Sequence, residues 1–283
     1  MKTIKTLLLS VIVFTLTACS AGISLYSPQE QVQIGKQLDQ EIRANPKEYP
    51  IDKRDAQVRD YIDKNIFRPI LASPAIKYRN VFPYQLEIIH NDSVINAFAT
   101  PGGYVYVYTG LLKYIDSEAA LAGVLAHEIG HAENEHASKR MFDAMLLQTG
   151  SSLLVKDSSP ELLKIGVALG AQGWIMKNSR KDEDQSDQVS FEYLKSTKFY
   201  PGGVKFMFEK MRDDGSVAAG GGSGNALVKA LKFFTDSHPD PIKRIDVINS
   251  KIKESGMPLK TYKNSDKDIF KSEYDKNIKK KLR

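Results

Sequence analysis

The sequence predicts a mainly helical α+β domain in which a small β-sheet precedes a helix that carries a metal-binding motif. Apolar residues recur at helical spacing along most of the 283-residue chain. At residues 84–108 the period changes to the alternation typical of strands. A His-Glu-x-x-His motif follows at 127–131. With 42% hydrophobic and 26% charged residues, the chain has the composition of a globular protein.

The first residues are typical of an export signal and not of the folded domain. Lys2 and Lys5 form a basic start, and the apolar run at 7–18 is too short to span a bilayer as a finished helix. The run ends in Leu16-Thr17-Ala18-Cys19, which resembles the bacterial lipobox, in which the cysteine is lipidated and becomes the new N-terminus. The alternative is an ordinary cleaved signal that happens to contain a cysteine.

The lipobox sets expectations for location. We expect a lipoprotein signal peptide at 1–18 and a lipidated tether at 19–28, with the lipid on Cys19. Because Ser20 stands where an aspartate usually signals retention at the inner membrane, we expect a lipid anchor in the outer membrane, facing the periplasm. Cys19 is the only cysteine, so the exported body can form no disulfide.

The first half of the body is predicted to hold two helices followed by strands. Helices are expected at 28–44 and 55–67 from apolar residues three and four apart. Strands are expected at 84–90, 94–99 and 104–108, with a turn at Pro101-Gly102-Gly103. We expect these strands to form a β-meander.

The strand at 104–108 suggests a way to hold substrate. A strand beside the metal helix can pair with an extended peptide through backbone hydrogen bonds. Tyr104, Val105 and Tyr106 are therefore candidates for a substrate-binding strand. The alternative is an internal strand with tyrosines packed on both sides.

The second half is predicted to be helical. Ser117 should cap a helix running to about His136. Further helices are expected at 139–154, 161–176, 180–197 and 204–211, and a last one begins at Pro241, with Asp240 as its N-cap. Residues 213–225 are expected to form a flexible loop. The glycines at 220–224 lack the strand and lysine of a phosphate loop, which argues against nucleotide binding. We expect a metallopeptidase domain at 29–255 and a basic tail at 256–283, whose lysines should be solvated.

His127 and His131 are candidate zinc ligands. Residues four apart share one face of a helix, so both imidazoles can reach one Zn²⁺ per chain. Glu128 beside them is the candidate general base that works on water at the metal.

A catalytic zinc needs a third protein ligand. On a continuing helix His136 would lie about 180° from His127, and Glu135 would lie about 6 Å too far along the axis. Glu183 can act as the ligand, and Asp187, one turn later, can accept the free N–H of a ligating histidine. The alternative is an acidic first turn favoured by the helix dipole, which does not explain why this pair falls on the apolar side.

Four blocks in the chain carry a resemblance to a known family. They are Asn96-Ala97-Phe98 with Pro101-Gly102-Gly103, His127 to His131, Ser179-Arg180 with Glu183 and Asp187, and Ser237-His238-Pro239 with Arg244-Ile245. The chain resembles the zinc metallopeptidases that include HtpX, the CAAX prenyl proteases and the mitochondrial Oma-type proteases. It is most similar to soluble periplasmic lipoprotein members such as BepA and LoiP.

The resemblance implies a zincin-like peptidase fold with His127, His131 and Glu183 as zinc ligands. It also implies Glu128 as general base and Asp187 behind the ligands. Ser186 departs from the family, which usually has alanine there, but it is small enough to fit. In the family the His-Pro segment lies near zinc, where His238 would either occlude the open position or stabilise the transition state. The alternative for His238 is an ordinary loop histidine.

We therefore expect a zinc-dependent endopeptidase of the bacterial envelope that acts in quality control of misfolded envelope or outer-membrane proteins. Its expected partners are unfolded substrates, the membrane and the outer-membrane assembly machinery. The alternative is a lipoprotein chaperone or assembly factor whose metal site is gated or largely inactive. The net charge of +6 is mild, and we find no nucleic-acid-binding motif.

Overall fold

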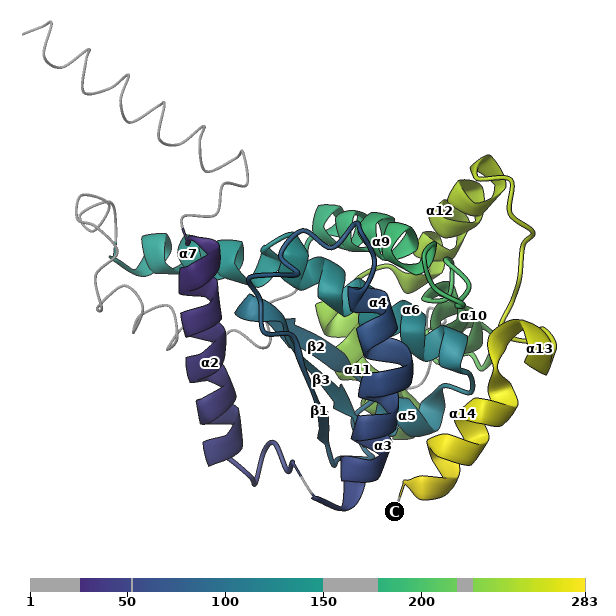
Figure 1. The fold of residues 1–283 in the computed structure, drawn as a ribbon, viewed down its shortest axis with the longest axis horizontal. Helices are drawn as coiled ribbons and strands as arrows, with labels where there is room; N and C mark the ends of the chain where they lie inside the picture. The colour runs from purple at the N-terminus through teal and green to yellow at the C-terminus, as the bar shows by residue number, and fades with distance from the viewer. Residues whose placement is uncertain (1–25, 52, 150–177, 218–225, 283) are drawn as a thin grey trace, which may run out of the picture.

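The computed structural model describes residues 26–51, 53–149, 178–217 and 226–282. A small sheet lies among helices, as the α+β prediction requires (Figure 1). The predicted signal peptide, Cys19, the helix at 161–176 and the glycines at 220–224 lie outside the described residues. In the part of the chain that is described, no helix is both long and apolar enough to cross a membrane.

The sheet has three strands, β1 (Gln85–Ile89), β2 (Ala97–Thr100) and β3 (Tyr104–Tyr108), in the order β1-β3-β2. β3 is parallel to β1 and antiparallel to β2. The predicted β-meander is therefore wrong. The connection between β1 and β2 carries the chain past the position next to β1, and β3 then fills that position.

A tight turn joins β2 to β3 and supports the first helix. Gly102 and Gly103 adopt φ of 75° and 81°, a conformation that favours glycine, within the turn η3 (Pro101–Gly103). Helix α2 (Pro28–Ala44), which Ser27 and Glu30 cap reciprocally, crosses this turn. A Cβ at Gly35 would lie 1.9 Å from the carbonyl oxygen of Pro101, so only glycine permits this crossing.

Helix α6 (Glu118–Glu133) is the central element and is buried along its whole length. Ser117 caps it, as predicted, by accepting a hydrogen bond from the backbone N–H of Ala120. α6 packs against β2 and against helix α9 (Arg180–Leu194). A Cβ at Gly130 would lie 2.8 Å from Cγ2 of Val189 on α9, so glycine allows the two helices to approach closely.

The predicted continuation of this helix to His136 differs from the structure. α6 ends at Glu133, and Glu135 adopts φ of 61°. Helix α7 (His136–Thr149) begins directly after this residue. The break is a C-terminal turn around Asn134, whose amide donates to the carbonyl oxygen of Gly130.

The other helices surround this centre (Figure 1). The predicted helix at 55–67 is present as consecutive helical segments, with a wider turn at residues 63–67. The remaining segments are η1 (Lys53–Asp55), α3 (Ala56–Ile62), η2 (Asp63–Phe67), α4 (Arg68–Leu71), α5 (Thr109–Tyr114), α10 (Lys205–Asp213), α11 (Ala226–Ser237), α12 (Pro241–Glu254), α13 (Asp266–Ile269), α14 (Lys271–Asn277) and η5 (Lys279–Lys281).

Asp240 does not cap α12 as predicted. Its φ of 56° lies in the left-handed region and its side chain makes no capping hydrogen bond. The carboxylate instead lies 2.5 Å from Nε of Arg180 on α9. Pro241 does occupy the first turn of the helix, as expected.

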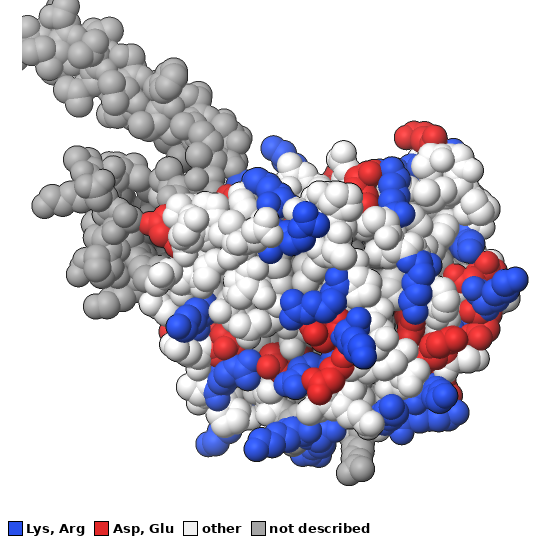
Figure 2. All heavy atoms as spheres, viewed as in Figure 1, with Lys and Arg blue, Asp and Glu red and all other residues white. Residues whose placement is uncertain are grey.

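The C-terminal segment packs onto the domain, in contrast to the solvated tail that its lysines suggested. Ile269, Tyr274 and Ile278 are fully buried, and the Tyr274 hydroxyl donates to the carbonyl oxygen of Leu112. The apolar residues face the core while the lysines point outward, so a basic composition is compatible with packing. On the face drawn in Figure 2, basic side chains lie among acidic ones and gather along the lower edge.

Candidate metal centre

His127 and His131 lie side by side on α6, as their spacing predicted. Their Nε2 atoms are 3.0 Å apart. Glu183 of α9 faces both rings, with its two carboxylate oxygens each 3.3 Å from one Nε2 atom. The structure thus brings together the three residues that we expected as ligands.

The donor set fits a single zinc ion. His127, His131, Glu183 and His238 each offer a donor atom, all buried, and these atoms lie within 4.8 Å of one another. Ligands about 2.1 Å from a tetrahedral zinc are about 3.4 Å apart, close to the spacings within this cluster. Lone pairs that converge in this way repel one another unless a cation lies between them.

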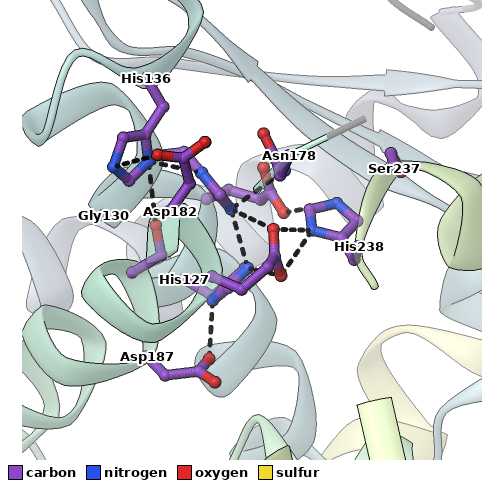
Figure 3. Close-up of polar contacts among 12 residues, drawn as sticks. His127, Gly130, His136, Asn178, Asp182, Asp187, Ser237 and His238 are labelled. Carbon is purple, nitrogen blue, oxygen red and sulfur yellow. Dashed lines mark hydrogen bonds and ion pairs between the residues drawn. The ribbon is translucent and has the colours of Figure 1, made fainter. Parts of the chain in front are cut away.

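Asp187 and Arg244 support the cluster from behind. Nδ1 of His127 lies 2.9 Å from Oδ1 of Asp187, below His127 in Figure 3. The guanidinium of Arg244 on α12 donates to both Asp187 oxygens at 2.7 and 2.8 Å and to Glu183 at 2.5 Å. Asp187 thereby fixes the tautomer of His127 that leaves Nε2 free for a metal.

The charges around the cluster determine its protonation. Burial raises the pKa of Glu183, but its interactions with His238 and Arg244 prevail and hold that pKa well below the ordinary value. Burial and Arg244 lower the pKa of His127, but hydrogen bonds to Asp187 and Glu183 raise it to about 9. Burial lowers the pKa of His131 well below its ordinary value. Zinc binding would therefore displace a proton from His127.

Glu128 lies beside the cluster and lines the same cleft as His131 and His238. The residue is buried, and burial raises the pKa of its carboxyl group. Oε1 has no hydrogen-bond partner among the described residues and lies 3.6 Å from Nε2 of His238. A buried carboxylate with a raised pKa and an unoccupied oxygen can accept a proton from water.

A cleft of about 260 Å³ opens onto Glu128, His131 and His238. Strand β2 and the turn after it form one wall, and the end of α11 forms another. Much of the wall is apolar: the lining includes Leu38, Tyr49, Val94, Phe98, Tyr108, Met141 and Phe233. The cleft therefore reaches the cluster at His131 and His238.

His238 belongs to the cluster and is not an ordinary loop histidine. It follows α11, with its backbone N–H bonded to Phe234 and its ring stacked on the Phe234 ring. Its Nδ1 lies 3.2 Å from both oxygens of Glu183. His238 and the preceding Ser237 come from an element distinct from those of the other ligands (Figure 3).

The sequence profile of Peptidase family M48 matches residues 53–252, which include every residue of this centre. The chain belongs to peptidase family M48. This finding confirms the family resemblance that the four sequence blocks indicated.

Named M48-type relatives share about 30% of their residues with the chain. The beta-barrel assembly-enhancing protease of Escherichia coli K12 is 29% identical over 203 residues, which are 69% of this chain and 40% of that protein. The protease of the same name from Yersinia pestis is 32% identical over 140 residues, which are 46% of this chain and 29% of that protein. The mitochondrial metalloendopeptidase OMA1 of Schizosaccharomyces pombe is 30% identical over 184 residues, which are 63% of this chain and 49% of that protein. The chain thus spans less than half the length of each.

Two side chains at this M48 centre were missed by the sequence analysis. Arg244 was quoted in a motif without a role, yet it lies on the same apolar stripe as Ile248 and Ile252, and a charge there signals a buried ion pair. His136 was rejected as a ligand on the assumption of a continuous helix. It is not in the cluster, but its Nδ1 lies 2.8 Å from Nδ1 of His131.

Ser186, the departure from the M48 pattern, fits as expected. It is fully buried against Gly130, where its small side chain allows α9 to approach α6.

The strand predicted to bind substrate is not available for pairing. β3, with Tyr104, Val105 and Tyr106, lies between β1 and β2, so both of its edges are already hydrogen-bonded. The alternative of an internal strand with tyrosines packed on both sides agrees with this topology, since Tyr104 and Tyr106 are buried. In the described part of the sheet, β2 borders the cleft with Phe98, Ala99 and Thr100, whereas β3 contributes only Tyr108 at its end.

Proposed function

We propose that the protein is a zinc-dependent endopeptidase. The observation that carries the proposal is the convergence of His127, His131 and Glu183 next to a buried Glu128 that opens onto a cleft. Membership of a peptidase family and the relatives named as metalloendopeptidases support the same activity.

The proposed mechanism assigns a separate task to each group. His127, His131 and Glu183 would hold the zinc, which would supply Lewis acidity for the scissile carbonyl and for the attacking water. Glu128 takes the proton of the attacking water and delivers it to the leaving amine. Asp187 holds His127 in the tautomer that binds metal. No covalent intermediate is needed.

The proposed substrate-binding strand is β2. Opposite residues in an antiparallel pair alternate between hydrogen-bonded and non-hydrogen-bonded pairs. The Tyr108 N–H bonds to the carbonyl of Asn96, so the backbone groups of Ala97 and Ala99 point away from β3. Ala99 lines the cleft, so its backbone N–H and C=O are the groups with which an extended peptide can pair.

We further propose that His238 occludes the open metal position until substrate arrives. Its place among the ligand atoms supports this role, and its distance of 3.6 Å from Glu128 suits a group that leaves as water enters. Replacement by alanine should then raise the rate of cleavage of an unfolded protein. A slower rate with unchanged zinc affinity would instead assign His238 to the transition state.

We propose that the peptidase acts in the periplasm, on a lipid anchor at Cys19 in the outer membrane, in quality control of misfolded envelope proteins. The lipobox supports the location, and similarity to proteases named for enhancing beta-barrel assembly supports an association with outer-membrane assembly. Identifying the envelope proteins that accumulate on a Glu128→Gln variant tests this role. Enrichment of cytoplasmic proteins alone would contradict it.

The Glu128→Gln variant also tests the mechanism. It should retain one zinc per chain while cleavage of casein falls at least about 100-fold, since general-base assistance contributes that much or more. The Glu192→Gln variant, which changes a partly exposed carboxylate on α9 outside the cleft, should cleave at the ordinary rate. Retained proteolysis in Glu128→Gln would refute the general-base assignment.

A lipoprotein chaperone with a gated metal site is the second candidate, because His238 lies among the ligands. The two functions differ in their response to a chelator. A peptidase loses cleavage of unfolded outer-membrane protein when zinc is removed, whereas a chaperone continues to prevent aggregation and cleaves nothing in either state.

A further inference from the structure

His136 contacts a zinc ligand but offers no ligand atom to the cluster. It is 1% exposed and lies at the first position of α7, directly after the break at residues 134–135. Its Nδ1 lies 2.8 Å from Nδ1 of His131, on the side of His131 that faces away from the metal cluster. Two ring nitrogens at this distance form a hydrogen bond only if one carries the proton and the other does not.

The other ring nitrogen of His136 also has a partner. Nε2 lies 3.0 Å from Oε1 of Gln185 on α9 and 3.6 Å from Oδ1 of Asp182. The hydroxyl oxygen of Ser186 lies 3.4 Å from Nδ1. In Figure 3 His136 and Asp182 lie on the opposite side of the site from His238.

Zinc ligation determines every proton in this chain of contacts. His131 presents Nε2 to the cluster, so its proton must be on Nδ1. That N–H can donate only to an unprotonated Nδ1 of His136. The proton of His136 is then on Nε2, where it donates to the Gln185 carbonyl oxygen, an acceptor. The direction His131 to His136 to Gln185 is therefore the only one compatible with a bound metal.

We propose that His136, itself oriented by Gln185, is the positioning residue that fixes the tautomer and ring orientation of His131 for zinc. The inference rests on the zinc site of the proposed peptidase. Its tests measure metal binding and proton positions, so they can succeed or fail independently of proteolysis.

The two ligand histidines would thus be supported differently. His127 is supported by the carboxylate of Asp187, which is paired with Arg244, whereas His131 is supported by a neutral imidazole. A carboxylate increases the basicity of a ligating imidazole more than a neutral acceptor does. The arrangement also links α6, α7 and α9 behind the metal, since each element contributes one member of the chain.

Two substitutions separate the role of Nδ1 from that of Nε2. The amide of asparagine lies as far from the backbone as Nδ1 of histidine, and that of glutamine lies as far as Nε2. His136→Asn therefore retains an acceptor for the His131 N–H, and His136→Gln does not. In a zinc competition assay with a chromogenic chelator, His136→Gln should bind zinc about 10–100-fold more weakly, and His136→Asn should stay within about 3-fold of the parent.

A control for the loss of a histidine is His90→Asn. His90 contacts Asp55 at 2.8 Å through Nδ1 and lies outside the cleft and the cluster, so this variant should bind zinc as the parent does. Equal zinc affinities of His136→Gln and the parent would overturn the proposal. Equal losses in His136→Asn and His136→Gln would also overturn it, because the loss would then not depend on the acceptor at Nδ1.

Nitrogen-15 NMR of the histidine rings in the zinc-loaded, unsubstituted protein provides a test that needs no variant. The proposal requires a proton on Nδ1 of His131, on Nε2 of His136, and a bare Nδ1 on His136. A proton found on Nδ1 of His136 would refute it, whether or not the protein cleaves casein.

Discussion

Arg244 has the largest effect that we expect from one side chain behind the metal cluster. It is the cation that offsets Asp187 and Glu183 in a buried setting. Arg244→Met leaves these carboxylates without that cation and should lower the free energy of unfolding of the metal-free protein by about 3–5 kcal/mol. Urea titration at neutral pH measures this. Arg180→Met removes an exposed guanidinium and should change the free energy of unfolding by less than about 0.5 kcal/mol.

The effect of Arg244 should depend on pH. Burial raises the pKa of Asp187, but Arg244 outweighs burial and holds that pKa below its ordinary value. A lowered carboxyl pKa stabilises the fold above the ordinary pKa of about 3.9, and this contribution is lost as the pH falls below it. The difference in stability between parent and Arg244→Met should therefore narrow on acidification. A constant difference down to pH 3 would contradict this account of the ion pair.

Glu183 is the proposed ligand that comes from a helix other than the one with the two histidines. Glu183→Gln keeps the size of the side chain but removes its charge, and zinc affinity should fall at least about 100-fold, because loss of a ligand exceeds the effect of losing a partner behind one. Zinc competition measures this directly. Full zinc stoichiometry at unchanged affinity would exclude Glu183 as a ligand.

The residues near the metal cluster were largely predictable, including Asp187, but the supporting residues Arg244 and His136 were not. His127, Glu128 and His131 follow from helical spacing, and Glu183 with Asp187 from a carboxylate pair on an apolar face. His136 depends on where α6 ends, which is set by the left-handed turn at Glu135. Nothing in helical periodicity reveals that turn.

At the scale of elements, β2 is expected to hold the substrate. Ala99→Pro removes an N–H that points to the cleft and leaves the hydrogen bonds to β3 intact, and an edge strand tolerates proline there. The KM for an unfolded protein substrate should rise about 10-fold with little loss of zinc. Ala99→Gly, which keeps the N–H, is the matched control, and equal KM values for the two variants would contradict pairing at β2.

Strand positions were predicted well from alternation, but their order in the sheet was not. Alternation locates a strand and its faces, whereas pairing depends on how a connection crosses the sheet. The segment between β1 and β2 carries no signal that excludes a meander, and the parallel pairing of β1 with β3 follows only from the folded path. A meander would have placed β3, the predicted substrate strand, at the edge of the sheet, whereas it lies at the centre.

At the scale of the whole molecule, the C-terminal helices are part of the domain. Tyr274 is fully buried and donates a hydrogen bond to Leu112 on α5. Tyr274→Ala should lower the free energy of unfolding by about 3–5 kcal/mol through the cavity and the lost hydrogen bond. Lys276→Ala, on the same helix, should change it by less than about 0.5 kcal/mol. If urea titration gives the same free energy of unfolding for Tyr274→Ala and the parent, the C-terminal segment is a solvated tail and this account of its packing is wrong.

The α+β class and the position of the central helix were predictable, because apolar periodicity and the metal motif can both be read from short stretches of sequence. The packing of the C-terminus was not, because six basic residues among its last thirteen obscure the two buried apolar side chains Tyr274 and Ile278. The composition of a segment describes its exposed face as much as its buried one.

Zinc titration of the metal-free protein tests the central claim most directly. Chelation should abolish cleavage of casein, and stepwise addition of zinc should restore it in proportion, with saturation at one zinc per chain. Cleavage that survives chelation, or one tightly bound zinc with no cleavage of any unfolded protein, would contradict the account of a single-zinc peptidase.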